Sequence, residues 1–202
     1  MIRYGLGLAA VAAAVCGSVL AQAPAALADP VAFSGTIHGA AHMAVQNLDA
    51  PIDPGTAVGS FDPDTGDVTV DIQLPRLMDR GRQWGLIPYT SRDIGIVPTA
   101  SAKGHVDANG LTLTQPFRFI VPNLTLDWIP AINWSSGEAC NTADDSVMTL
   151  TAPGVTDPRN GFTATGSFDM GRFTGCGLLS DPLFTWTMTS PGNKVTLTFD
   201  PA

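Results

Sequence analysis

The sequence predicts a single all-β domain, with an antiparallel β-sandwich as the expected architecture and a barrel as the alternative. Short segments alternate apolar and polar residues with a period of two, as half-buried strands do. The chain has 21 Gly and 16 Pro, many of them in turn signals between these segments. No window of about 11 or more residues keeps a helical period with caps at both ends, so we expect strands without helical crossovers.

The amino end predicts a secretory signal peptide, residues 1–28, ahead of one secreted β domain over residues 29–202. Arg3 precedes a run of small and apolar residues, and Ala26-Leu27-Ala28 has the A-x-A form of a cleavage site. No later segment is continuous enough to form a transmembrane span. We therefore expect a protein that is secreted or associated with the cell envelope.

Two cysteines, Cys140 and Cys176, remain after removal of the predicted signal peptide. An even number of cysteines in an exported chain predicts a disulfide. Closing the loop between them would stabilise the fold by roughly 4 kcal/mol on the chain-entropy estimate. Two buried free thiols are the alternative.

The strands follow from the alternation, in chain order. Residues 68–74 place Val68, Val70 and Ile72 on one face and polar side chains on the other. Threonine fills the polar face of the later segments, as β-propensity favours. These later strands are expected over residues 111–114, 147–151, 162–165, 184–188 and 195–199.

The acidic stretch SFDPDTGDVTVDI, residues 60–72, begins like a calcium loop. Gly66, however, falls where that loop needs an oxygen ligand, and a strand follows where it needs a helix. A hairpin turn fits instead, because Asp62 can accept backbone N–H groups and Gly66 can take a left-handed conformation. Hairpin loops are also expected at residues 107–110 and 190–193.

Two segments, residues 75–91 and 133–145, are expected to be long irregular loops, which in compact domains are usually functional or mobile. Arginines and aromatic residues alternate in and after the first, where four of the chain's 10 cations lie between residues 76 and 92. An arginine fork can hold a carboxylate or phosphate, and an aromatic ring offers an apolar face. The alternative is an ordinary loop whose arginines pair with aspartates. The predicted ligand-binding residues are Arg76, Arg80, Arg82, Trp84, Tyr89 and Arg92.

A second apolar concentration is FRFIVPNLTLDWIPAINW, residues 117–134. Its apolar side chains are expected to fill the core between the sheets. If the sheets are held apart at one end, the same residues would line an apolar pocket open to the arginine-containing loop. The residues concerned are Phe117, Phe119, Val121, Leu124, Leu126, Trp128 and Ile132.

Several classes of chemistry find no support. A net charge of −8 is unsuited to nucleic acid, which needs a clustered basic footprint. His38 and His42 would lie about 13 Å apart on a strand, too far to share a metal, so we expect neither a metal nor another cofactor. There is no G-x-S-x-G elbow, and catalytic residues are not indicated; a dispersed site that includes His105 is the enzyme alternative.

The carboxyl-terminal pattern TATGSFDMGRFTGCGLLSDPLFTWTMTSPGNKVTLTFDP, with GSFDPDTGDVTV and ACNT upstream, resembles small secreted or cell-envelope proteins of actinobacteria, including mycobacteria. Such proteins are largely of unknown function. The resemblance implies that Cys140 and Cys176 pair and that a turn precedes the last strand, and it implies no catalytic residue.

We therefore expect a secreted, disulfide-stabilised cell-envelope protein that acts without catalysis and binds an apolar or anionic amphiphilic ligand. The expected partner is a lipid or an acidic glycan of the envelope, not nucleic acid. A hydrolase with a dispersed site and a purely structural or adhesive module are the alternatives. The sequence gives no indication of the oligomeric state.

Overall fold

The computed structural model describes residues 29–83, 86–128 and 132–202, and the predicted signal peptide lies outside them. Eight antiparallel strands close into a barrel in the order β10-β11-β13-β1-β2-β3-β6-β7, and pairing of β7 with β10 completes the ring. The barrel strands are β1 (Val31–Met43), β2 (Leu48–Phe61), β3 (Asp67–Gln73), β6 (Ala102–Asp107), β7 (Gly110–Ile120), β10 (Ser146–Pro153), β11 (Phe162–Met170) and β13 (Ser190–Pro201).

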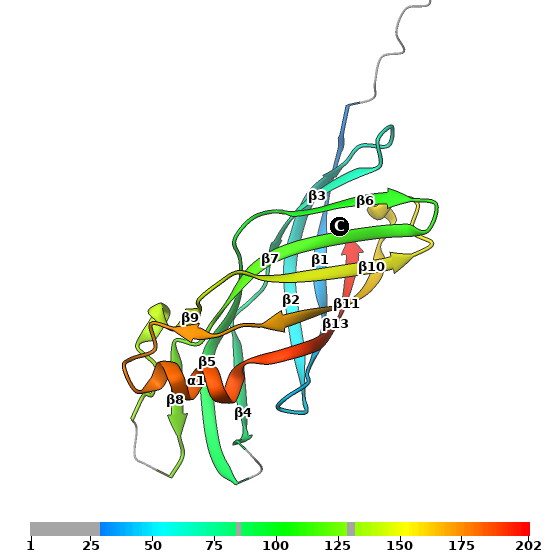
Figure 1. The fold of residues 1–202 in the computed structure, drawn as a ribbon. Helices are drawn as coiled ribbons and strands as arrows, with labels where there is room; N and C mark the ends of the chain where they lie inside the picture. Colours follow the sequence, from blue (N-terminus) through cyan, green and yellow to red (C-terminus); the bar gives the residue numbers. More distant parts are fainter. Residues whose placement is uncertain (1–28, 84–85, 129–131) are drawn as a thin grey trace, which may run out of the picture.

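The remaining elements gather at one end of the barrel (Figure 1). Residues 95–98 of β5 pair with β7. The preceding part of β5 extends away from β7 and pairs with β4 on one side and β8 on the other. The helix α1 lies at the same end, close to the short β9–β12 pair. These elements are β4 (Leu77–Gln83), β5 (Ile87–Pro98), β8 (Asn123–Leu126), β9 (Asn141–Thr142), β12 (Phe173–Thr174) and α1 (Ser180–Met188), with 3₁₀ turns at Gly137–Ala139 and Pro158–Asn160.

The all-β antiparallel class is confirmed, and of the two architectures considered the barrel is the one observed. Thr149 of β10 faces Thr114 of β7 across the closing ladder. This pairing removes the free edges that a sandwich would leave. The predicted disulfide is also present, between Cys140 and Cys176.

Inward-facing apolar side chains of the alternating strands fill the end of the barrel remote from α1. The buried residues of β3 are Val68, Val70 and Ile72, as the sequence predicted. Aromatic rings pack there edge to face, with Phe33 and Phe199 centred 5.6 Å apart. This end therefore has a packed core like that of other small barrels.

The acidic stretch forms the predicted hairpin turn between β2 and β3. The Asp62 carboxylate accepts from the backbone N–H groups of Asp64 and Thr65 at 2.9 and 3.2 Å, and Gly66 has φ 82°. These bonds favour the ionised form and hold the pKa of Asp62 below its usual value. The predicted hairpin at residues 107–110, between β6 and β7, is confirmed as well.

Three local predictions are wrong. Residues 184–188, expected as a strand, belong to α1, and residues 190–193 are part of β13 instead of a hairpin loop. Much of residues 75–91 forms the β4–β5 hairpin instead of an irregular loop. The physical reason in the first case is that strand and helix both place Phe184 and Met188 on one face, since those residues are four apart.

Candidate functional site

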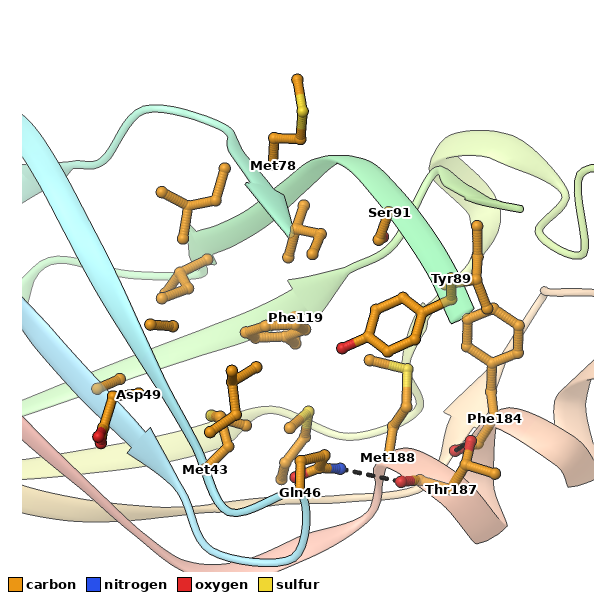
Figure 2. A pocket seen from close by; sticks show the side chains of 18 of the residues that line it. Met43, Gln46, Asp49, Met78, Tyr89, Ser91, Phe119, Phe184, Thr187 and Met188 are labelled. Atoms are coloured by element: carbon orange, nitrogen blue, oxygen red, sulfur yellow. Dashed lines mark hydrogen bonds between the residues drawn. The ribbon is translucent and has the colours of Figure 1, made fainter. Parts of the chain in front are cut away.

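An apolar cavity of about 240 Å³ lies between the α1 end of the barrel, the β4–β5 hairpin and α1 (Figure 2). Most of its wall consists of aliphatic, methionine and aromatic side chains, with few polar groups. The lining residues are Ala41, Met43, Gln46, Leu48, Asp49, Ala50, Pro51, Ile52, Asp53, Leu77, Met78, Ile87, Tyr89, Ser91, Ile94, Ile96, Phe119, Leu124, Leu126, Phe168, Met170, Leu183, Phe184, Thr187 and Met188. A small apolar cavity with a few convergent polar groups is the usual form of a ligand site.

Strand alternation places the wall residues from the barrel. Ala41 and Met43 are two apart on β1, and Phe168 and Met170 are two apart on β11, so each pair points inward. Phe119 does the same from β7 and lies centrally in Figure 2. The barrel thus supplies a rigid, preformed floor for the cavity.

Helical spacing places the wall residues of α1. Phe184, Thr187 and Met188 lie at positions i, i+3 and i+4 and all line the cavity. Trp186, which on a strand would share the face of Phe184 and Met188, is instead 69% exposed. The face of α1 that covers the barrel is therefore the one that only a helix can assemble.

Several contacts hold α1 and the segment just before it in place. The Asp181 carboxylate accepts from the backbone N–H groups of Cys176 and Gly177 at 2.6 and 3.1 Å. The Cys140–Cys176 disulfide connects this segment to the residues beside β9, where Val121 donates its N–H to the Cys140 carbonyl. The disulfide therefore anchors α1 across the end of the barrel.

Two uncharged polar side chains in the wall have contrasting partners. Gln46, from the turn between β1 and β2, donates its Nε2 amide to the Thr187 carbonyl at 2.9 Å, which orients its Oε1 away from that bond. Oε1 is buried without a hydrogen-bond partner among the described residues. Ser91 is satisfied, since its hydroxyl donates to the Asn123 carbonyl at 2.9 Å. Gln46 Oε1 is thus a buried acceptor in a wall residue that no described group satisfies.

Of the predicted ligand-binding residues that the structure describes, Tyr89 lines the cavity. Figure 2 shows its ring directed into the space from β5. It lies over Gly81, its direct partner on β4, where an added Cβ would be 2.8 Å from the tyrosine oxygen. The glycine leaves room for this ring position.

The register of the β4–β5 hairpin separates the predicted arginines from the cavity. Arg80 and Arg82 oppose Thr90 and Pro88, whereas Gly81 opposes the cavity-lining Tyr89. Since directly opposed residues share a face and neighbours alternate, these two arginines lie on the face away from the cavity.

The other predicted residues have different surroundings. Arg92 follows the cavity-lining Ser91 on β5 and is exposed on the opposite face. Arg76 donates to Glu138 at 3.0 Å and to the Asp93 backbone carbonyl at 3.1 Å, so its ion pair is with a glutamate, whereas the alternative expected aspartates. Trp84 lies outside the described residues. The structure thus brings Tyr89 to the cavity and leaves Arg80, Arg82 and Arg92 at the surface beside it.

The apolar segment 117–134 divides between core, cavity and surface. Phe117 and Val121 are buried in the core, while Phe119, Leu124 and Leu126 line the cavity. Trp128 and Ile132 are exposed. The segment therefore contributes to the core and to the cavity wall, while Trp128 and Ile132 belong to neither.

The residues of a dispersed catalytic site are not assembled in the described part of the chain. Each of the three histidines contacts an aspartate: His38 with Asp200, His42 with Asp49 and His105 with Asp67, at 3.0, 2.7 and 3.2 Å. Within the described residues no serine is hydrogen-bonded to any of them, and no cluster of His, Cys, Asp or Glu has metal-binding geometry. The described residues therefore assemble no serine–histidine pair of the kind a Ser-His-Asp triad needs.

Sequence reasoning missed the contributions of β1, β2 and α1 to the cavity. The available signal was the segment Ser180–Met188, in which Asp181 and Pro182 suit a first helical turn and the apolar residues have spacing i, i+4. No protein-family model matches the chain, and neither a curated protein nor a solved structure does. Among the described residues, no helix has the length and apolar character needed to span a membrane.

Proposed function

We propose that this is a secreted, non-catalytic protein of the cell envelope that binds an apolar or amphiphilic ligand in the cavity between the barrel and α1. The observation that carries the proposal is the cavity itself, in a barrel whose other end is packed. A bound apolar chain would bury the apolar wall of this cavity, at about 25 cal/mol per Å² of apolar surface removed from water. The cavity therefore supports a site for an apolar ligand.

The polar groups of the wall favour a neutral head group over an anionic one. Gln46 presents a buried acceptor, and the two charged wall residues, Asp49 and Asp53, are acidic and exposed. A hydroxyl or amide on the ligand could donate to Gln46, whereas a carboxylate could not. The proposed ligand is therefore an apolar chain with an uncharged hydrogen-bond donor, and the arginines outside remain available to the surroundings.

A displacement titration tests this proposal. The uncharged fluorescent probe N-phenyl-1-naphthylamine is titrated into the purified protein and then displaced with decanol or with decanoate. We expect one probe per chain, with stronger displacement by decanol. Absence of saturable fluorescence enhancement would refute binding in the cavity, and stronger displacement by decanoate would refute the neutral head group.

A matched pair of variants tests whether Gln46 determines the preference for decanol over decanoate. Gln46→Leu removes the buried acceptor and is expected to reduce the preference for decanol over decanoate while the probe still binds. Gln73→Leu alters an exposed amide at the end of β3 and leaves that preference unchanged. An equal change in both variants would contradict the assigned role of Gln46.

A further inference from the structure

Exposed apolar side chains are concentrated at the cavity end of the molecule. Of the large exposed apolar residues in the described ranges, those on the barrel strands are three valines: Val31, Val58 and Val147. The others lie on the turn between β1 and β2, on β4, next to β5, after β8, and in or just before α1, all at one end in Figure 1. They are Val45, Met78, Leu86, Trp128, Ile132, Leu178, Leu179 and Trp186.

We refer to these eight exposed residues as the rim, and several of them neighbour cavity-lining residues in the chain. Val45 adjoins the lining residue Gln46, Leu86 adjoins Ile87, and Trp186 adjoins Thr187. Met78 is itself a lining residue, and Trp128 is two residues beyond Leu126. Several separate turns and a helix thus present apolar side chains to solvent at one end of the molecule, which is unusual for a surface that contacts water alone.

Several members of the rim are largely exposed to solvent. Leu178 and Leu179 are 94% and 81% exposed at the start of α1, and Trp128 is 65% exposed beyond β8. Apolar tips on separate projecting turns can enter a soft medium independently, whereas a rigid protein partner would need a matching pocket for each. Tryptophan also favours the region between lipid head groups and acyl chains.

Charge beside the rim indicates which lipid surface fits. Arg80, Arg82 and Arg92 are exposed on the outer face of the hairpin that carries Met78 and Leu86, and none forms an ion pair within the described residues. They stand out in a chain of net charge −8. Basic residues next to apolar and tryptophan side chains match an anionic membrane interface.

We infer that the cavity end docks on the surface of an anionic lipid bilayer, with the rim residues entering the interface and the arginines contacting lipid head groups. The inference rests on the proposed function and deepens it, because docking would place the cavity where an apolar ligand leaves or enters the membrane. Ligand exchange would then occur without exposing the apolar chain to water.

Vesicle flotation with the purified protein tests the inference. Vesicles of phosphatidylcholine with phosphatidylglycerol are compared with vesicles of phosphatidylcholine alone. We expect binding to the anionic vesicles, weakened at least about tenfold by Leu178→Ser with Leu179→Ser, since burial of each leucine contributes roughly ten- to hundredfold to an equilibrium constant. Val58→Ser with Val147→Ser, on the barrel wall, is the matched control and leaves vesicle binding unchanged.

The arginines have a separate readout. Arg80→Gln with Arg82→Gln is expected to weaken binding to anionic vesicles by about fivefold per residue, with a smaller dependence on salt, and to leave binding to neutral vesicles unchanged. Because these side chains face away from the cavity, titration with N-phenyl-1-naphthylamine in the absence of vesicles stays the same.

The outcomes separate this inference from the proposed function. Probe binding without vesicle binding overturns the docking surface and leaves the cavity function standing, whereas loss of both overturns both. Equal vesicle binding by the leucine and valine variants also overturns the docking surface. Self-association that is abolished by the leucine variant, without vesicle binding, assigns the rim to a second copy of the chain and overturns the lipid assignment.

Discussion

The substitution Ala41→Leu tests whether the cavity is free space that a ligand needs. Ala41 is 6% exposed on β1 and lines the cavity, so a leucine there would extend into it. Leucine adds three apolar carbons, and burying them contributes about 2 kcal/mol at about 0.8 kcal/mol each. For a chain of this size we expect the melting temperature to rise by about 4–8 °C.

The same change should remove ligand stabilisation. A ligand present at 100 times its dissociation constant stabilises the folded state by about 2.7 kcal/mol, which corresponds to about 5–11 °C in melting temperature. Wild-type protein should show this increase with decanol, and Ala41→Leu should show little of it. Thermal unfolding followed by circular dichroism, with and without decanol, measures both effects.

Ala164→Leu provides the matched control. Ala164 is 1% exposed on β11 and does not line the cavity. Adding the same three carbons to packed interior is expected to destabilise by about 1–3 kcal/mol. If Ala41→Leu destabilised the protein as much as this control, or kept the full response to decanol, the reasoning from the cavity would be refuted.

Three further predictions concern the hairpin, the disulfide and pH. Gly81→Ala should push the Tyr89 ring from its position and weaken probe binding in fluorescence titration, while Gly171→Ala, which meets nothing within 4 Å, should not. Reduction of the disulfide should cost about 4 kcal/mol in urea unfolding with and without reductant; identical curves would contradict its anchoring role. The Arg159 guanidinium holds the pKa of Asp157 below its usual value of 3.8, so this carboxylate contributes stability that is complete above that value and lost as pH falls through the lowered pKa. Replacing Asp157 with Asn should therefore flatten the loss of stability below about pH 4, as measured by urea unfolding across acidic pH; an unchanged acid limb would count against this assignment.

The strands were predictable because period-two alternation is local. The spacing of Val68, Val70 and Ile72 predicts which face of β3 is buried, and no other strand is needed for that prediction. Closure of the barrel was not decided at that level, since it depends on pairing between β7 and β10, whose paired residues lie about 30 or more positions apart. A sandwich and a barrel can use the same alternating strands, so one sequence does not separate them.

The candidate site was predictable only in part, for reasons of register. The sequence singled out Tyr89 and the nearby arginines as one cluster, but pairing parity on β4 and β5 places Tyr89 and Arg82 on opposite faces. The bulge between Leu77 and Asp79 interrupts the alternation that would have revealed a hairpin. The segment in α1 was misassigned because nine residues are too few to separate the two periods.

Methyl NMR of the methionines tests the central claim most directly. Met43, Met170 and Met188 line the cavity, whereas Met148 on β10 opposes the lining residue Phe168 and is not itself part of the wall. With [¹³C-methyl]methionine, titration of decanol should shift the three cavity signals in a saturable way and shift the Met148 signal less. Unchanged cavity signals at saturating decanol, or equal shifts at Met148, would contradict ligand binding in this cavity.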